Sequence, residues 1–340
     1  GSDAPRLKFV FQFLRQALGA AMRVWLATQA VMASQEALEA GVRLAEALRG
    51  SDAPSPNPFC IAKSCLSNAT KCLVDTDCRK GMMCTAGCGG VNQTCIFQCT
   101  SEYENQVYDD MLRCFFTNHD CMKMPAGEYY DNLAMCRGTD VAPATTTYRN
   151  ESLTEDIALD LLRRGVNGSG YWLVAKGLSH AYDCFDCQNL WWTPAEGKSP
   201  LRYDAIYKIH KPDGGIRWNS ATYDVRHYGE PGRFIFHAAD YGGLVHEEDW
   251  RILAMDERIH RDPQWIALYY CGGAEGVKEN YEGSCVVTVD GLMPTDDKEV
   301  AKINAAYKKA GIDLACTPDN SPEACANHPV PPFAATPVVV

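Results

Sequence analysis

Cysteine is the residue type whose number and spacing point most directly to chemistry in this chain. Seventeen cysteines occur among 340 residues, and eleven of them lie between Cys60 and Cys136. Thiols at such density usually pair as disulfides in an oxidising compartment, or else they bind zinc. Zinc is disfavoured because His119 is the only histidine in the cluster and the spacing is irregular, without CxxC pairs. We therefore predict a disulfide-rich region and no metal.

The next candidates for chemistry are two adjacent acids, Glu248 and Asp249, which directly precede Trp250. A carboxylic acid in an apolar cavity holds its proton more firmly and can donate it to a reacting oxygen. The two acids also fit the solvated edge of a strand. Tyr270, a further candidate, also fits a strand in which it is simply packed in the core. The residues by themselves leave these alternatives open.

Composition narrows the class of protein and of partner. The chain is 46% hydrophobic and 22% charged, which is typical of a globular protein, and its formal net charge is −11. It has no basic stripe and no Gly-rich phosphate loop. We therefore expect no nucleic-acid partner.

Residues 165–315 must supply the elements that position such side chains, and they contain eight strand-like runs. In one run Tyr203, Tyr207 and Ile209 share a face, as alternation in a half-buried strand requires. Eight strands predict an all-β lipocalin-like barrel that can hold one elongated apolar ligand, although strand count also allows a β-sandwich. The runs are Tyr171–Leu178, Cys187–Ala195, Arg202–His210, Ile216–Tyr228, Gly232–Ala239, Asp249–Glu257, Gln264–Gly272 and Gly283–Gly291.

A C-terminal helix should follow the last strand. It is expected to begin near Thr295, where three acids suit the positive end of the helix dipole, and to end at Gly311. The organisation we predict is an N-terminal amphipathic helix or extension, a disulfide-rich mainly helical domain, a linker, the barrel with its helix, and a Pro/Val-rich tail. Their bounds are 1–54, 55–138, 139–164, 165–317 and 318–340.

The long helix expected over residues 6–49 has three interpretations. It is solvated or docked on a partner, it lies on a membrane surface, or it is the remainder of a targeting segment. Within the disulfide-rich domain, Glu102–Phe116 is also expected to be helical.

The cysteine ladder resembles that of violaxanthin de-epoxidase and its related proteins. Its ten steps are Cys60, Cys65, Cys72, Cys78, Cys84, Cys88, Cys95, Cys99, Cys114 and Cys121. The barrel adds Gly170-Tyr171-Trp172, which is similar to the Gly-X-Trp that opens a lipocalin. It also adds Tyr182–Gln188, Lys211–Gly215 and Tyr269-Tyr270. The resemblance covers roughly residues 60–316.

The resemblance implies a protein of the chloroplast thylakoid lumen, membrane-associated in one interpretation, that binds a xanthophyll carotenoid. It implies that ascorbate is the reductant and that a carboxyl group protonates an epoxide. Glu248 occupies the position of that acid, where the family has Asp, and Tyr270 matches the second catalytic residue. Trp250 and Asp183 are further candidate substrate-binding residues, and Asp183 fits a structural hydrogen-bonding role at the base of the barrel equally well.

The chain departs from the family at three further substrate-binding positions. Tyr223 replaces a glutamine, while His246 and Val287 each replace a tyrosine. It therefore looks nearer to the related proteins than to the enzyme, and two hypotheses stay open. One is an epoxy-xanthophyll-converting oxidoreductase. The other is a non-catalytic accessory or assembly subunit of a photosynthetic membrane complex, docked through its N-terminal helix and C-terminal tail.

The resemblance also implies a disulfide pattern. Six expected pairs are Cys60–Cys78, Cys65–Cys72, Cys84–Cys99, Cys88–Cys95, Cys114–Cys121 and Cys187–Cys316. A seventh, Cys271–Cys285, is expected because these residues lie on strands that should be antiparallel neighbours. Cys136, Cys184 and Cys325 are left without an assigned partner.

Overall fold

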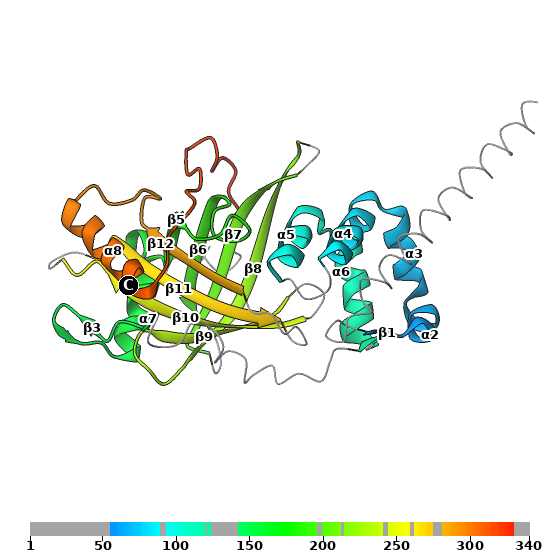
Figure 1. Ribbon diagram of the computed structural model, residues 1–340, viewed down its shortest axis with the longest axis horizontal. Helices are drawn as coiled ribbons and strands as arrows, with labels where there is room; N and C mark the ends of the chain where they lie inside the picture. The colour runs from blue at the N-terminus through cyan, green and yellow to red at the C-terminus, as the bar shows by residue number, and fades with distance from the viewer. Residues whose placement is uncertain are drawn as a thin grey trace, which may run out of the picture. The chain divides into compact units, whose positions relative to one another are not determined.

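A computed structural model of the chain describes residues 55–88, 93–119, 121–123, 142–195, 199–211, 214–240, 244–258, 262–274 and 281–329 (Figure 1). The helix expected over residues 6–49 and the end of the tail, 330–340, lie outside these residues. In the described ranges no helix combines the length and the apolar character that crossing a membrane requires.

The disulfide-rich region is mainly helical, as expected. Its elements are α2 (Pro58–Cys60), η1 (Ile61–Cys65), α3 (Leu66–Val74), α4 (Thr76–Gly87), α5 (Gln93–Tyr103), α6 (Gln106–Arg113) and η2 (Cys114–Asn118). The short strands β1 (Ser55–Pro56) and β2 (Met122–Lys123) pair antiparallel. The single helix expected over 102–116 is interrupted at Asn105, whose side chain accepts a hydrogen bond from the Tyr108 N–H and so caps α6.

The segments 55–74 and 106–123 run antiparallel, and this arrangement overturns three of the expected disulfides. Cys60 bonds Cys121, Cys65 bonds Cys114, and the Asn68 amide donates to the backbone of Asp110 at 2.9 Å. These contacts step along the two segments in opposite directions. Cys72–Cys78 then closes the turn between α3 and α4. The expected Cys60–Cys78, Cys65–Cys72 and Cys114–Cys121 pairs are therefore wrong, whereas Cys84–Cys99 and Cys88–Cys95 are confirmed.

This pairing predicts unequal costs for removing two of the bridges. Cys65–Cys114 spans 49 residues of sequence and Cys72–Cys78 spans 6. Because a longer closed loop restricts the unfolded chain more, the Cys65→Ser/Cys114→Ser double variant should lose about 1–2 kcal/mol more than Cys72→Ser/Cys78→Ser. Urea unfolding measures both losses. Peptide mapping without reduction gives an independent check, and a Cys65–Cys72 peptide would refute the pairing.

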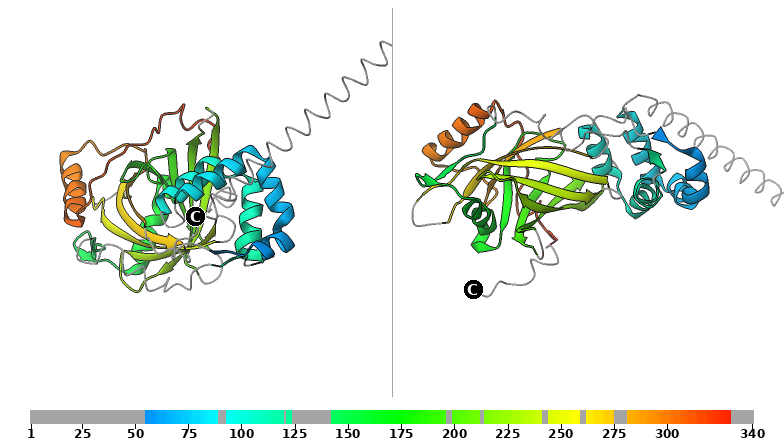
Figure 2. Two further views of the ribbon diagram at one scale, coloured as in Figure 1. Left: turned by 45° about the vertical axis from the view of Figure 1, so that its right-hand side comes forward. Right: turned by 90° about the horizontal axis from the view of Figure 1, so that it is seen from below.

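All eight expected strands form, and they close into one barrel (Figures 1 and 2). The strands are β5 (Tyr171–Gly177), β6 (Asp186–Pro194), β7 (Leu201–His210), β8 (Ile216–His227), β9 (Arg233–Asp240), β10 (Leu244–Met255), β11 (Trp265–Ala274) and β12 (Tyr281–Thr288). Each strand pairs antiparallel with the next, and β12 returns to β5 through pairs such as Val287 with Val174. That closure excludes a sandwich and confirms the barrel.

Helix α7 (Glu155–Arg164) occupies the stretch expected to be a linker. Thr154 caps it, and its buried Leu161 and Leu162 join the barrel core. The Trp172 indole N–H donates to the Leu162 carbonyl at 2.8 Å, which ties the helix to β5. Gly170 has φ +74°, and a Cβ there would lie 2.0 Å from the Trp192 carbonyl oxygen, so the Gly-X-Trp motif requires its glycine.

Helix α8 (Asp297–Ala310) confirms the expected C-terminal helix. Asp296 caps it, and Gly311 ends it in the left-handed conformation with φ +67°. Its buried face contributes Ile303 and Tyr307 to an apolar cluster on the outside of the barrel, which includes residues of β10, β11 and β12. Figure 1 shows the helix beside these strands.

Two disulfides attach the segment after α8 to the start of β6. Gly177 and Cys316 exchange backbone hydrogen bonds, which brings Cys316 to Cys184 instead of the expected Cys187. Cys187 bonds Cys325, which was left unassigned. The Cys187–Cys316 prediction is wrong because the backbone bridge at Gly177 fixes which cysteine Cys316 meets.

The expected Cys271–Cys285 bridge is wrong, although β11 and β12 are neighbours. Cys285 lies opposite Leu268, and Cys271 lies opposite Glu282, so the two thiols are on opposite faces of the sheet. Cys271 is buried in the cluster under α8 and forms a disulfide elsewhere. Cys285 faces the barrel interior and is the free cysteine among the described residues.

Candidate functional site: an aromatic chamber with two buried acids

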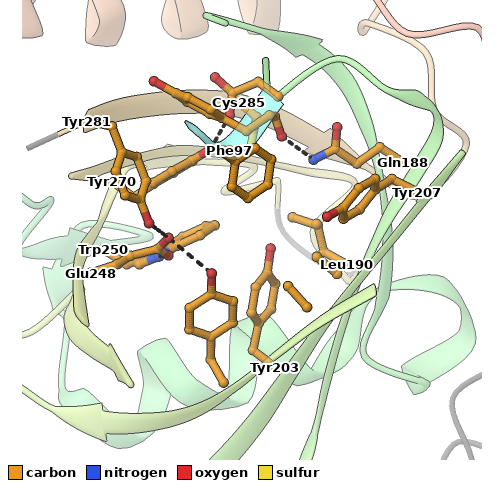
Figure 3. Close-up of a pocket in the computed structure, with 15 residues that line it drawn as sticks. Phe97, Gln188, Leu190, Tyr203, Tyr207, Glu248, Trp250, Tyr270, Tyr281 and Cys285 are labelled. Carbon is orange, nitrogen blue, oxygen red and sulfur yellow. Dashed lines mark hydrogen bonds between the residues drawn. The ribbon is translucent and has the colours of Figure 1, made fainter. Parts of the chain in front are cut away.

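The barrel interior contains a small chamber lined by fifteen residues, eight of which are aromatic (Figure 3). Its free volume of about 40 Å³ holds roughly three water molecules. Most of the interior is therefore filled by side chains. The lining includes five of the seven catalytic and substrate-binding residues predicted from the sequence, namely Asp183, Tyr223, Glu248, Trp250 and Tyr270.

Glu248 projects into this chamber from β10 and is only 4% exposed. Its Oε2 accepts a hydrogen bond from the Trp250 indole at 2.6 Å, and its Oε1 accepts from the Tyr223 hydroxyl at 3.3 Å. The Tyr281 hydroxyl also donates to Oε1. Glu248 lies opposite Gly272 on β11, where a Cβ would come within 2.6 Å of the Glu248 Cγ. The absence of a side chain at Gly272 therefore leaves the space that the Glu248 side chain occupies.

A second carboxyl group, Asp183, lies in the same chamber and is 1% exposed. Its Oδ1 accepts from the Tyr270 hydroxyl at 2.5 Å, and its Oδ2 accepts from the Ser179 and Ser284 amides at 2.9 and 3.1 Å. Burial raises the pKa of Asp183 to about 7, against the lowering effect of these donors. Asp183 therefore carries a proton at mildly acid pH.

Tyr270 reaches Asp183 because its cross-strand partner on β12 is Gly283. A Cβ at that position would lie 2.0 Å from the Tyr270 Cζ. The Tyr270 ring also stacks on Trp250, and Trp250 stacks on Phe236, each pair at 4.5 Å between ring centroids. Three stacked rings therefore form one aromatic layer, of which Trp250 and Tyr270 line the chamber.

The other two predicted substrate-binding residues, His246 and Val287, are buried but do not line the chamber. Burial lowers the pKa of His246 to about 4, so it stays neutral at pH 5 to 7. Val287 belongs to the packed core. Asp249, the neighbour of Glu248, faces the other side of the sheet and is held by Arg233 and Arg251 at 2.8 and 2.7 Å.

Several chamber residues were not predicted from the sequence. Tyr281 shares a face with Cys285 and would have been found by extending the last strand run two residues toward the N-terminus. Cys285 was assigned to a disulfide. Phe97 comes from α5 in the disulfide-rich domain, and no local pattern connects it with the barrel.

The chemistry of the chamber follows from its charges. Two carboxyl groups line it, and the lining includes no Lys, Arg or His. An anionic ligand would therefore meet acids without a compensating cation in a site of low polarity, which is unfavourable. A neutral apolar ligand with an oxygen-bearing ring fits better. Such an oxygen could accept a proton from a buried carboxylic acid.

Comparison with known proteins gives a consistent family assignment. Residues 57–320 match the model of the VDE lipocalin domain. Violaxanthin de-epoxidase of Nicotiana tabacum is 24% identical over 260 residues, covering 75% of this chain and 48% of that protein. Violaxanthin de-epoxidase of Arabidopsis thaliana is also 24% identical, and the match covers 75% of this chain and 50% of that protein. The chain thus spans about half the length of these relatives. Among solved structures, insecticyanin from Manduca sexta is similar over 55% of this chain and 87% of its own, with 15% identity and a TM-score of 0.36.

Proposed function

Since this chain belongs to the violaxanthin de-epoxidase lipocalin family, we propose that it binds an epoxy-xanthophyll in the barrel and reduces the epoxide. The observation that carries the proposal is the placement of Glu248. A buried acid on the wall of an aromatic chamber, which also contains a second acid with a pKa of about 7, suits the proton donation that epoxide opening requires.

In the proposed reaction Glu248 donates a proton to the epoxide oxygen as the first C–O bond breaks. Ascorbate supplies two electrons and two protons overall, and becomes dehydroascorbate. The second C–O bond then breaks, the oxygen leaves as water, and a carbon–carbon double bond remains. Asp183 is the proposed store from which Glu248 is reprotonated, while Tyr270 and Trp250 hold the ring end of the carotenoid.

The proposed compartment is the thylakoid lumen of the chloroplast. The curated relatives are named as chloroplastic proteins, and a chain with seven disulfides in its described part suits an oxidising compartment. Association with the thylakoid membrane or a photosynthetic complex is part of the proposal.

A second candidate function is favoured by the small free volume of the chamber. A free volume of about 40 Å³ cannot admit a carotenoid ring unless aromatic side chains move. If they do not move, the chain is a lipocalin scaffold that serves as an accessory subunit. Incubation with violaxanthin and ascorbate at pH 5 and pH 7.5, followed by pigment chromatography, separates the two. De-epoxidised pigment supports the enzyme, and its absence together with absence of pigment binding supports the scaffold.

A further inference from the structure

Phe97 is the one chamber-lining residue that the barrel region does not supply. It lies on α5, is partly buried against the barrel core, and meets the Tyr182 ring edge-on at 5.9 Å between centroids. In the view of Figure 3 its ring lies between Tyr270 and Tyr207. An aromatic side chain from a neighbouring domain therefore covers part of the space around Glu248 and Asp183.

Two disulfides hold Phe97 in place. It lies between Cys95 and Cys99. Cys99 is bonded to Cys84 on α4, and Cys95 is bonded to Cys88, which directly follows α4. The ring is thus carried by a helix that cannot separate from α4. Movement of the Phe97 backbone away from the chamber would require the α4–α5 unit to move as a whole.

Polar contacts fasten this unit to the barrel. The Arg217 guanidinium donates to the Ser101 carbonyl at 2.6 Å and lies 3.6 Å from the Glu104 carboxylate. The Asn219 amide donates to Glu104 at 3.0 Å. A separate ion pair joins Lys211 to Asp77 at 2.6 Å. Most of these side chains are partly exposed, so the contacts are weak enough to break and re-form.

We propose that the α4–α5 unit is the gate of the barrel chamber, with Phe97 as the residue that a ligand must displace in order to enter. The ligand it would admit is a neutral, elongated molecule with a flat ring at one end. The identity of that ligand rests on the proposed function, whereas the gate itself does not. The ligand site would then be a composite of both domains, which explains how a nearly filled chamber can still accept a ring.

Cys285 provides a test that needs no ligand. It is a free thiol, 2% exposed, and it lines the same chamber. N-ethylmaleimide should therefore modify it only when the gate opens. Phe97→Ala should accelerate this labelling about tenfold, because removing a partly buried ring favours the open state. Phe59→Ala is the matched control, because Phe59 is 76% exposed on the same domain and should leave the rate unchanged.

Three further arms keep the result interpretable. Cys285→Ser identifies the labelled site. Urea unfolding of each variant sets the labelling rate that global unfolding alone would allow, and the Phe97→Ala rate must exceed it. Lys211→Gln/Arg217→Gln leaves Phe97 in place and should also accelerate labelling. A folded Phe97→Ala protein that labels at the wild-type rate would overturn the gate.

A last arm separates the gate from the proposed function. Violaxanthin in detergent micelles should slow the labelling of wild-type Cys285 if the carotenoid occupies the chamber. Fast labelling of Phe97→Ala without protection by violaxanthin would keep the gate and reject the xanthophyll. Protection by violaxanthin with no effect of Phe97→Ala would reject the gate and keep the ligand.

Discussion

Glu248→Gln is expected to reduce epoxy-xanthophyll turnover by about 10²–10⁴-fold, because an amide cannot donate the proton that opens the epoxide. Pigment binding should change little, since the amide has the shape of the acid. The amide oxygen can still accept from Tyr223 and Tyr281. Its nitrogen would face the Trp250 indole N–H, so a stability loss of about 1–3 kcal/mol is expected.

Steady-state de-epoxidation with ascorbate measures the first effect, and urea unfolding measures the second. Glu247→Gln is the matched control, because Glu247 lies next in the chain but pairs with His237 at 2.9 Å on the other face. That variant should keep wild-type turnover. Glu248→Gln with undiminished turnover would remove Glu248 from the mechanism.

Asp183→Asn should change how the free energy of unfolding depends on pH. Burial raises the pKa of Asp183 in the folded state to about 7, from the ordinary value of 3.8 for an aspartate. The stabilisation it contributes is therefore fully present below about pH 4, and it is lost as pH rises through 7. A shift of this size corresponds to about 4 kcal/mol. Asparagine does not titrate, and it can keep the contacts to the Ser179 and Ser284 amides while donating to Tyr270.

Urea unfolding between pH 4 and pH 8 tests this expectation. Relative to the wild type, Asp183→Asn should gain about 4 kcal/mol of stability across that range, with no further gain above it. Asp224→Asn on the exposed side of β8 is the control and should follow the wild-type profile. Parallel profiles for Asp183→Asn and the wild type would show that Asp183 is not held protonated.

The barrel could be predicted from the sequence because alternation fixes which side chains point inward. The run around Tyr203, Tyr207 and Ile209 is buried on the predicted face. The same rule places Glu248 and Trp250 together in the chamber. The chamber's limits are harder to predict, because they depend on how far along each strand the packed core extends. That is why Val287 belongs to the core and Tyr281 to the site.

Several of the predicted disulfide pairs were wrong for a different reason. Which cysteines pair depends on the register of the strands and on the relative direction of the helices. Tyr270 and Val287 were both predicted to face the ligand. Cys271 follows Tyr270 and must then face outward, while Cys285 shares the face of Val287 and must face inward. Alternation alone therefore excluded the Cys271–Cys285 bridge. The Cys60–Cys121 and Cys65–Cys114 pairs could not be deduced, because no local pattern sets two helical segments antiparallel.

The bridges Cys184–Cys316 and Cys187–Cys325 have a consequence for how the protein withstands proteases. Seven of the eight barrel strands, β6 to β12, lie between the ends of the Cys184–Cys316 bridge. A single cut in any surface loop between those cysteines would leave both pieces covalently joined and paired in the same sheet. Such a nicked molecule would run as one chain until it is reduced. The protein would thus tolerate cleavage in its connecting loops. Reduction of the two disulfides, more than cleavage of the backbone, would separate the pieces of the barrel.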